Sequence, residues 1–197
     1  MDRLTLYGSF TSSSSYKPML YLALARLPFS FRTVNLKTGV QKTPEYLAIN
    51  RWGVVPSLRH RGLTILQSNV ILDYLARETG HFEGRTEQQR WQAREWLSWE
   101  ADHITYVAKV RHSARFRASH PETIAEYRPR AEAAPSFVDN TVKHQPFLVS
   151  IAQSLTLDAG AAWCSWPKAG SISTTGLISR LGRGASRRCR ASRCLMS

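Results

Sequence analysis

The order of hydrophobic patterns in the first 34 residues constrains the fold of this chain more than any other feature. Leu4 to Tyr7 (LTLY) has the length and composition of a short buried strand. Met19 to Leu27 (MLYLALARL) predicts a helix, and Phe29 to Val34 predicts a second strand with a β-branched end. The apolar face of the helix is expected to contain Leu20, Ala23, Leu24 and Leu27. A strand, a helix and a strand in this order imply a parallel pair joined by a crossover.

A helical turn, a hairpin and a longer helix are expected next. Pro44 to Leu47 predicts the turn, and two short apolar segments, 57–60 and 63–66, predict a hairpin around Arg61-Gly62. Ser68 is expected to cap the helix that follows. The apolar face of this helix would contain Val70, Ile71, Tyr74 and Leu75. Residues 1–80 are therefore predicted to form an α/β domain with the order βαβαββα.

The next part of the chain is expected to be all-helical. Residues 87 to about 117 alternate apolar and charged faces at helical spacing, which predicts one long helix or two. Residues 121–150 contain a helix-like stretch that Pro129 and Pro135 are expected to interrupt. Trp96 and Trp99 are interpreted as core residues. We expect an all-α C-terminal domain over residues 87–150, which the unusual tail after it would leave incomplete.

Basic residues give the chain a net charge of +13, from 27 Lys and Arg against 14 Asp and Glu. Such a charge suggests nucleic-acid binding. However, seven of the basic residues and none of the acidic ones follow Asp158, so residues 1–158 carry only +6. All three cysteines also lie in this last segment, without metal-binding spacing, so no metal site is predicted. Residues 151–197 thus form an atypical basic tail.

The hydropathy of the chain indicates a cytoplasmic protein. No apolar run reaches the roughly 18 residues that cross a bilayer. Met1-Asp2-Arg3 leads into a strand without the apolar stretch of a secretory signal. We therefore expect no membrane association.

Three segments, taken together, resemble one protein family. LYGSFTSSSSYK, TPEYLAINRWGVVPSL and LTILQSNVILDYLARE follow each other at the spacing of the thioredoxin-like domain of the glutathione transferases. The resemblance implies that residues 1–80 bind glutathione as a co-substrate and activate its thiolate for attack on a small electrophile. It also implies a homodimer.

The resemblance assigns the glutathione peptide to two segments. Gln67-Ser68 would hold the γ-glutamyl group, where a strand ends and a helix N-terminus favours an anion. The Val55-Pro56 bond would be cis, with the Val55 backbone pairing with the cysteinyl residue of the ligand. From the residues alone, Ser68 could be only a helix cap and Pro56 only a trans proline that begins a strand.

The serine run would hold the glutathione sulfur. Phe10 to Lys17 (FTSSSSYK) resembles the serine–cysteine–serine loop of the zeta class, which places Ser12 and Ser13 on the catalytic and sulfur-contacting serines. Ser14 stands where that class has cysteine, so maleylacetoacetate isomerase chemistry is a weaker prediction. Pro18 is expected to delay the start of the first helix. The run could also be only a polar strand-to-helix connection.

In the family, the acceptor substrate lies between the second domain and the serine loop. Tyr106, Arg111 and His112 are the resulting acceptor-site candidates. A solvated basic face is the alternative explanation of residues 111–117.

The resemblance ends abruptly after Ser150. SISTTGLIS (171–179) can be encoded by nucleotides that, read one base earlier, give FDLDDWPDI. LGRGASRRCRAS (181–192) permits AWAGRESPLPGF with the same offset. Both strings resemble the ordinary end of the family's second domain. We therefore hypothesise that the tail is out of frame with the ancestral coding sequence, or is disordered.

The altered tail leaves three functions open. The chain is either an active glutathione transferase or a non-catalytic glutathione-binding member that the tail has inactivated. A basic nucleic-acid-binding protein using SRRCRASRC is the third reading, and the lack of aromatic residues between these charges argues against it.

Overall fold

The computed structural model describes residues 3–116 and 121–143. The chain divides into two compact units, Met1–Glu83 and Gly84–Ser197, which are treated separately below. The predicted tail over 151–197, its proposed reading frame and the last part of the predicted helical domain, 144–150, lie outside the described residues.

The first unit is built on a four-stranded mixed sheet with the strand order β2-β1-β3-β4. β1 (Leu4–Gly8) pairs in parallel with β2 (Phe29–Thr33) and antiparallel with β3 (Ser57–His60). β3 continues into β4 (Leu63–Leu66) through a two-residue turn. Both turn residues, Arg61 and Gly62, have positive φ, as the favoured two-residue hairpin turn requires. The predicted parallel pair and the predicted hairpin are confirmed.

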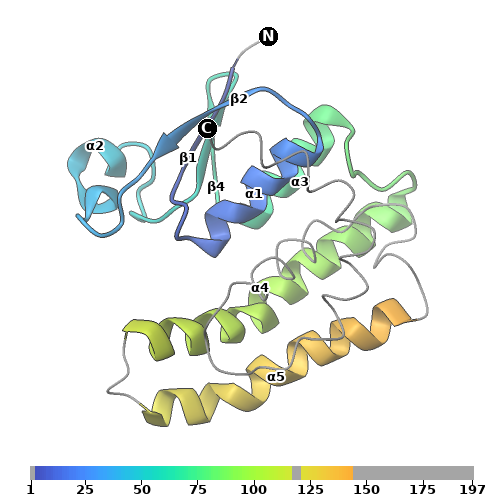
Figure 1. The fold of residues 1–197 in the computed structure, drawn as a ribbon. Helices are drawn as coiled ribbons and strands as arrows, with labels where there is room; N and C mark the ends of the chain where they lie inside the picture. Colours follow the sequence, from blue (N-terminus) through green and yellow to red (C-terminus); the bar gives the residue numbers. More distant parts are fainter. Residues whose placement is uncertain (1–2, 117–120, 144–197) are drawn as a thin grey trace. The chain divides into compact units, whose positions relative to one another are not determined.

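Two helices pack side by side against this sheet (Figure 1). They are α1 (Ser13–Leu24) and α3 (Ser68–Thr79). The centre of the core is fully buried and consists of Leu6, Leu22, Leu58, Ile71 and Leu75. A 3-10 turn, η1 (Val40–Lys42), and the short α2 (Pro44–Leu47) complete the predicted βαβαββα order. The first unit therefore has the thioredoxin-like fold.

Helix α1 begins earlier than its sequence suggests. It starts at Ser13 and contains Pro18, so the prediction that Pro18 delays the helix was wrong. The Ser12 cap stabilises the first turn, and Pro18 deletes only the bond to the Ser14 carbonyl. The predicted buried face was also wrong, since Ala23 and Leu24 are exposed. The residues of α1 that are buried are Ser15, Lys17, Pro18, Tyr21 and Leu22.

Helix α3 differs from its prediction in two details. Ser68 is the first helical residue rather than the cap, and Gln67 occupies the N-cap position. Val70 is 54% exposed, whereas Leu72 is buried beside Ile71 and Leu75. The apolar residues of this helix fit two overlapping faces, and the sheet selects the one that includes Leu72.

The described part of the second unit is a pair of long helices that lie side by side (Figure 1). They are α4 (Glu87–Phe116), a single helix, and α5 (Pro121–Lys143). Val107 and Val110 of α4 are buried together with Ala131 of α5. Trp96 and Trp99 both pack against Phe137 of α5, but both are only half-buried, so the prediction that they are core residues was wrong. An all-helical region thus follows the α/β domain.

Two prolines lie inside α5 without interrupting it. The prediction that Pro129 and Pro135 break this segment was wrong, because one helix covers both. Ala134 and Val138 are almost fully buried on either side of Pro135. Burial of an apolar face stabilises a helix more than one absent N–H group destabilises it.

Candidate functional site

Strand pairing brings three of the predicted site segments to one end of the sheet. The residues that pair across β1, β3 and β4 at this end are Tyr7, Ser57 and Leu66. The serine run follows β1, Val55-Pro56 precedes β3, and Gln67-Ser68 follows β4. In antiparallel neighbours the end of one strand lies beside the start of the next. All three segments therefore lie at the same end of the sheet, which we call the site end.

Ser12 caps α1 at the site end. Its backbone is extended, and its Oγ accepts a hydrogen bond from the Ser15 N–H at 3.2 Å. A serine hydroxyl has one donor proton in addition to its acceptor lone pairs. The proton of Ser12 can therefore be donated to a ligand while the oxygen holds the helix end.

The other three serines of the run differ in exposure. Ser15 is fully buried, and its Oγ accepts the Ser9 N–H at 3.2 Å, so Ser15 supports the loop. Gly8 leaves room for it, because a Cβ on Gly8 would lie 3.1 Å from the Ser15 Oγ. Ser13 and Ser14 are half-buried in the first helical turn. Neither of their hydroxyls forms a hydrogen bond with the described residues.

A buried polar cluster holds the segment before β3. The Val54 carbonyl accepts hydrogen bonds from the Tyr46 hydroxyl at 2.9 Å and from Asn50 Nδ2 at 2.7 Å. Both side chains also bond to the Ser57 Oγ, each at 3.1 Å. Burial raises the pKa of Tyr46, so its hydroxyl stays protonated and keeps donating. This cluster fixes the backbone that enters Val55.

Val55 presents its backbone at the site end. The Val55-Pro56 bond is cis, as expected from the resemblance. Over residues 3–116 and 121–143, no hydrogen bond is made by the N–H or the carbonyl of Val55. Buried or half-buried backbone groups are nearly always paired in folded proteins. Val55 can therefore pair with an extended ligand as an added strand would.

The N-terminus of α3 supplies further donors. Gln67 has a φ of 69° and a side chain that makes no capping bond. The N–H groups of the first helical turn have no partner within the helix. Such groups, together with the helix dipole, favour a carboxylate or another anion. Ser68 is buried as the first residue of this helix.

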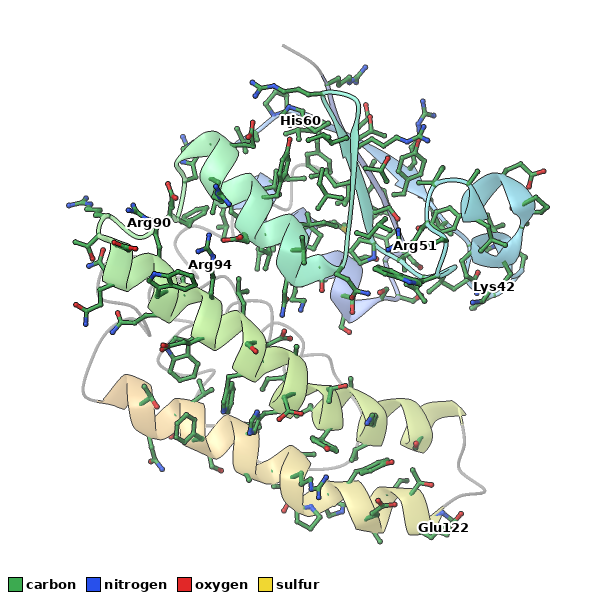
Figure 2. The ribbon with its side chains drawn as sticks, turned by 180° about the vertical axis from the view of Figure 1, so that it is seen from behind. Lys42, Arg51, His60, Arg90, Arg94 and Glu122 are labelled. Atoms are coloured by element: carbon green, nitrogen blue, oxygen red, sulfur yellow. The ribbon has the colours of Figure 1, made fainter. Side chains whose placement is uncertain are left out.

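Two cations beside the loop that precedes β3 were not predicted as site residues from the sequence. Lys42 Nζ donates to the Trp52 carbonyl at 3.4 Å, and the Arg51 guanidinium lies 4.5 Å from the Trp52 ring centre. Both lie on the α2 side of the first unit, whereas His60 lies at the opposite end of β3 (Figure 2). The sequence signal that could have identified these cations was their position near residues 53–56 (GVVP), because charges beside an exposed loop backbone can bind an anionic ligand.

The acceptor-site candidates lie on α4. The Tyr106 hydroxyl accepts a hydrogen bond from Arg130 Nη1 of α5 at 2.8 Å, and Lys109 Nζ lies 4.9 Å from the Tyr106 ring centre. Arg111 and His112 also belong to α4, but their side chains lie outside the described set. Their role toward an acceptor stays a prediction.

Neither a metal-binding cluster nor a membrane-spanning helix occurs within the described ranges. There, no group of three or more His, Cys, Asp or Glu residues is close enough to hold a metal ion. In the same part of the chain, no helix combines the length and apolar character needed to span a membrane.

Comparison with known proteins connects this geometry to one family. Residues 2–77 match the family model "Glutathione S-transferase, N-terminal domain". The chain is 42% identical over 73 residues to a zeta-class glutathione S-transferase of Euphorbia esula, covering 37% of this chain and 32% of that protein. It is 36% identical over 104 residues to glutathione S-transferase F10 of Arabidopsis thaliana, covering 50% and 47%. The matched region thus spans less than half the length of these relatives.

A solved structure supports the same fold. The crystal structure of a glutathione S-transferase from Pseudomonas fluorescens superposes with a TM-score of 0.82 and 24% identity. The superposition covers 93% of this chain and 94% of that one.

Proposed function

We propose that this chain, whose residues 2–77 match the N-terminal domain model of the glutathione S-transferases, is a member of that family that binds glutathione at the site end of the sheet and activates its thiol. The observation that carries the proposal is the convergence of three segments there: the capped serine run, the Val55 backbone and the N-terminus of α3. Glutathione is an extended tripeptide with a carboxylate at each end and a thiol in the middle. Three subsites of different chemistry are what such a ligand needs.

Each segment suits one part of the ligand. The γ-glutamyl carboxylate would bind at Gln67-Ser68, where the N-terminus of α3 favours an anion. The cysteinyl backbone would pair with Val55. The sulfur would face Ser12, whose hydroxyl proton is available, with Ser13 and Ser14 in the same helical turn.

Thiolate stabilisation follows from this placement. A free cysteine thiol has a pKa near 8.5, and a hydroxyl donor plus a helix N-terminus favours the thiolate. Lowering the pKa by about two units would make the bound thiol mostly ionised at neutral pH. The thiolate would then attack an electrophilic carbon, so that a C–S bond forms and the leaving group departs with its electron pair.

The acceptor substrate remains a class rather than a compound. We propose a small electrophile that contacts the second unit, with Tyr106, Arg111 and His112 as candidate contacts. Ser14 in place of a cysteine makes glutathione conjugation a better proposal than isomerisation. Members of this family are usually dimers and meet reduced glutathione in the cytoplasm, so we propose a cytoplasmic homodimer.

Titration calorimetry with glutathione, combined with the ultraviolet absorbance of the bound thiolate across pH, tests the proposal. We expect the wild-type protein to bind glutathione with a thiol pKa below the free value. Ser12→Ala should raise that pKa while binding is kept, and Ser14→Ala measures separately what the neighbouring hydroxyl of the run contributes. Turnover of an activated aryl chloride then separates an active transferase from a non-catalytic member. A folded wild-type protein that does not bind glutathione would refute the proposal.

A further inference from the structure

One buried cation joins the two helices that begin at the site end. Lys17 of α1 is only 8% exposed, and its Nζ donates to the Asn69 Oδ1 of α3 at 2.6 Å. Lys17 lies four residues after Ser13, so both are on the same face of α1. Side chains in a helix lean toward its N-terminus, which brings the Lys17 stem toward the serine run.

The partner of Lys17 has an equally informative position. Asn69 is the second residue of α3, directly after Ser68. The hydrogen bond therefore joins the first turns of α1 and α3, where the sulfur and the γ-glutamyl carboxylate would bind. The Lys17 ammonium also adds positive charge beside the sulfur subsite and the γ-glutamyl subsite, both of which would hold negative charge.

A second contact between these helices lies at the far end of α3. The buried Tyr21 hydroxyl donates to the His81 carbonyl at 2.7 Å and lies 2.9 Å from the Thr79 Oγ1. This contact fastens α1 to the C-terminal end of α3 and does not involve the site end. Tyr21 is therefore a natural control for Lys17.

We propose that Lys17 is a positioning residue that sets the separation of the sulfur subsite and the γ-glutamyl subsite through Asn69. The inference rests on the proposed glutathione site. Because one ligand must reach both subsites at once, a fixed separation of the two subsites reduces the ordering cost of binding. Lys17→Met removes the donor of the Asn69 Oδ1, so it should cost some stability as well as affinity, and Kd is compared between proteins shown to be folded.

The test compares four variants with the wild-type protein: Lys17→Met, Asn69→Leu, the double variant and Tyr21→Phe. Calorimetry measures Kd for glutathione and for S-methylglutathione, which has no ionisable thiol, and absorbance measures the thiol pKa. Lys17→Met and Asn69→Leu should each weaken both ligands about tenfold, because a hydrogen bond to a charged group is lost. Lys17→Met should also raise the thiol pKa of bound glutathione.

The double variant and the control separate positioning from general stability. The double variant should bind no more weakly than the weaker single variant, because both substitutions remove the same link. Tyr21→Phe should lower Tm and leave both Kd values within about twofold, since it changes only the far contact.

Three results would overturn the inference. Folded Lys17→Met or Asn69→Leu proteins that bind both ligands like the wild type would remove it and leave the proposed function intact. Loss of glutathione affinity with normal S-methylglutathione affinity would restrict Lys17 to the thiolate and remove the role in separation. A wild-type protein that binds neither ligand would instead refute the proposed function itself, and this inference with it.

Discussion

Removing the side chain of Asn50 should destabilise the first unit and weaken glutathione binding together. Asn50 is completely buried, and its side chain makes three hydrogen bonds with the described residues. Its Nδ2 donates to the Val54 carbonyl at 2.7 Å and to the Ser57 Oγ at 3.1 Å. Its Oδ1 accepts from the Trp52 N–H at 3.1 Å. These bonds hold the whole segment that leads into Val55.

The expected cost of Asn50→Ala can be worked from these bonds. The Val54 carbonyl and the Ser57 hydroxyl keep Tyr46 as a partner, whereas the Trp52 N–H loses its side-chain acceptor. With about 1 kcal/mol per net hydrogen bond, the free energy of unfolding should fall by about 2 to 3 kcal/mol. Since domains are stable by about 5 to 15 kcal/mol, the first unit should still fold at low temperature.

Urea unfolding followed by circular dichroism measures this loss, and calorimetry at 10 °C measures glutathione affinity. Asn35→Ala is the matched control, because Asn35 is exposed and its side-chain Oδ1 accepts one hydrogen bond within the described residues, from the Lys37 N–H at 3.0 Å. The control should change stability by less than about 0.5 kcal/mol. Equal losses for Asn50→Ala and Asn35→Ala would refute the reasoning. So would a large loss of stability in Asn50→Ala with normal glutathione affinity at 10 °C.

Three further changes test other parts of the first unit. Ser12→Ala removes the acceptor of the Ser15 N–H, so it should lower the free energy of unfolding by about 1 kcal/mol. Gly53→Ala should destabilise more than Gly62→Ala: both have positive φ, but only at Gly53 would a Cβ meet a backbone oxygen at 2.8 Å. Equal Tm values for the two glycine variants would contradict this. Burial raises the pKa of Tyr21 to about 12, above its unfolded value of 10.0, so stability is kept below pH 10 and falls as pH rises toward 12. Tyr21→Phe should flatten this alkaline decline in urea titrations.

Local patterns were sufficient for the sheet, whereas the residues at its site end were assigned through the family resemblance. β1, β2 and the hairpin were predicted because short apolar runs, alternation and Arg61-Gly62 are local signals. Gln67-Ser68 and Val55-Pro56 were assigned through the resemblance, because the residues alone also fit a helix cap and a trans proline. Strand order then places them together, and this order follows from few topological rules.

Features that depend on partners far along the chain were not predictable in this way. MLYLALARL is apolar on several sides, so periodicity alone could not identify Tyr21 and Leu22 as the buried residues. A lysine in a helix is normally expected to be exposed, and Lys17 is buried because Asn69, 52 residues later, supplies its acceptor. Pro18 gave the wrong start of α1 because its local penalty was weighed without the Ser12 cap.

The proposed recognition of glutathione depends mainly on backbone groups. A change of side chain in the serine run should therefore leave the peptide-binding groups of the site end in place. Val55 offers its N–H and carbonyl, and α3 offers the N–H groups of its first turn. These groups are positioned by buried side chains such as Asn50 and Ser57, which need not touch the ligand. A substitution in the serine run, such as Ser14→Cys, should therefore alter the chemistry at the sulfur and leave the peptide-binding backbone in place. Affinity for the peptide and reactivity of the thiol should accordingly respond to different residues of the first unit.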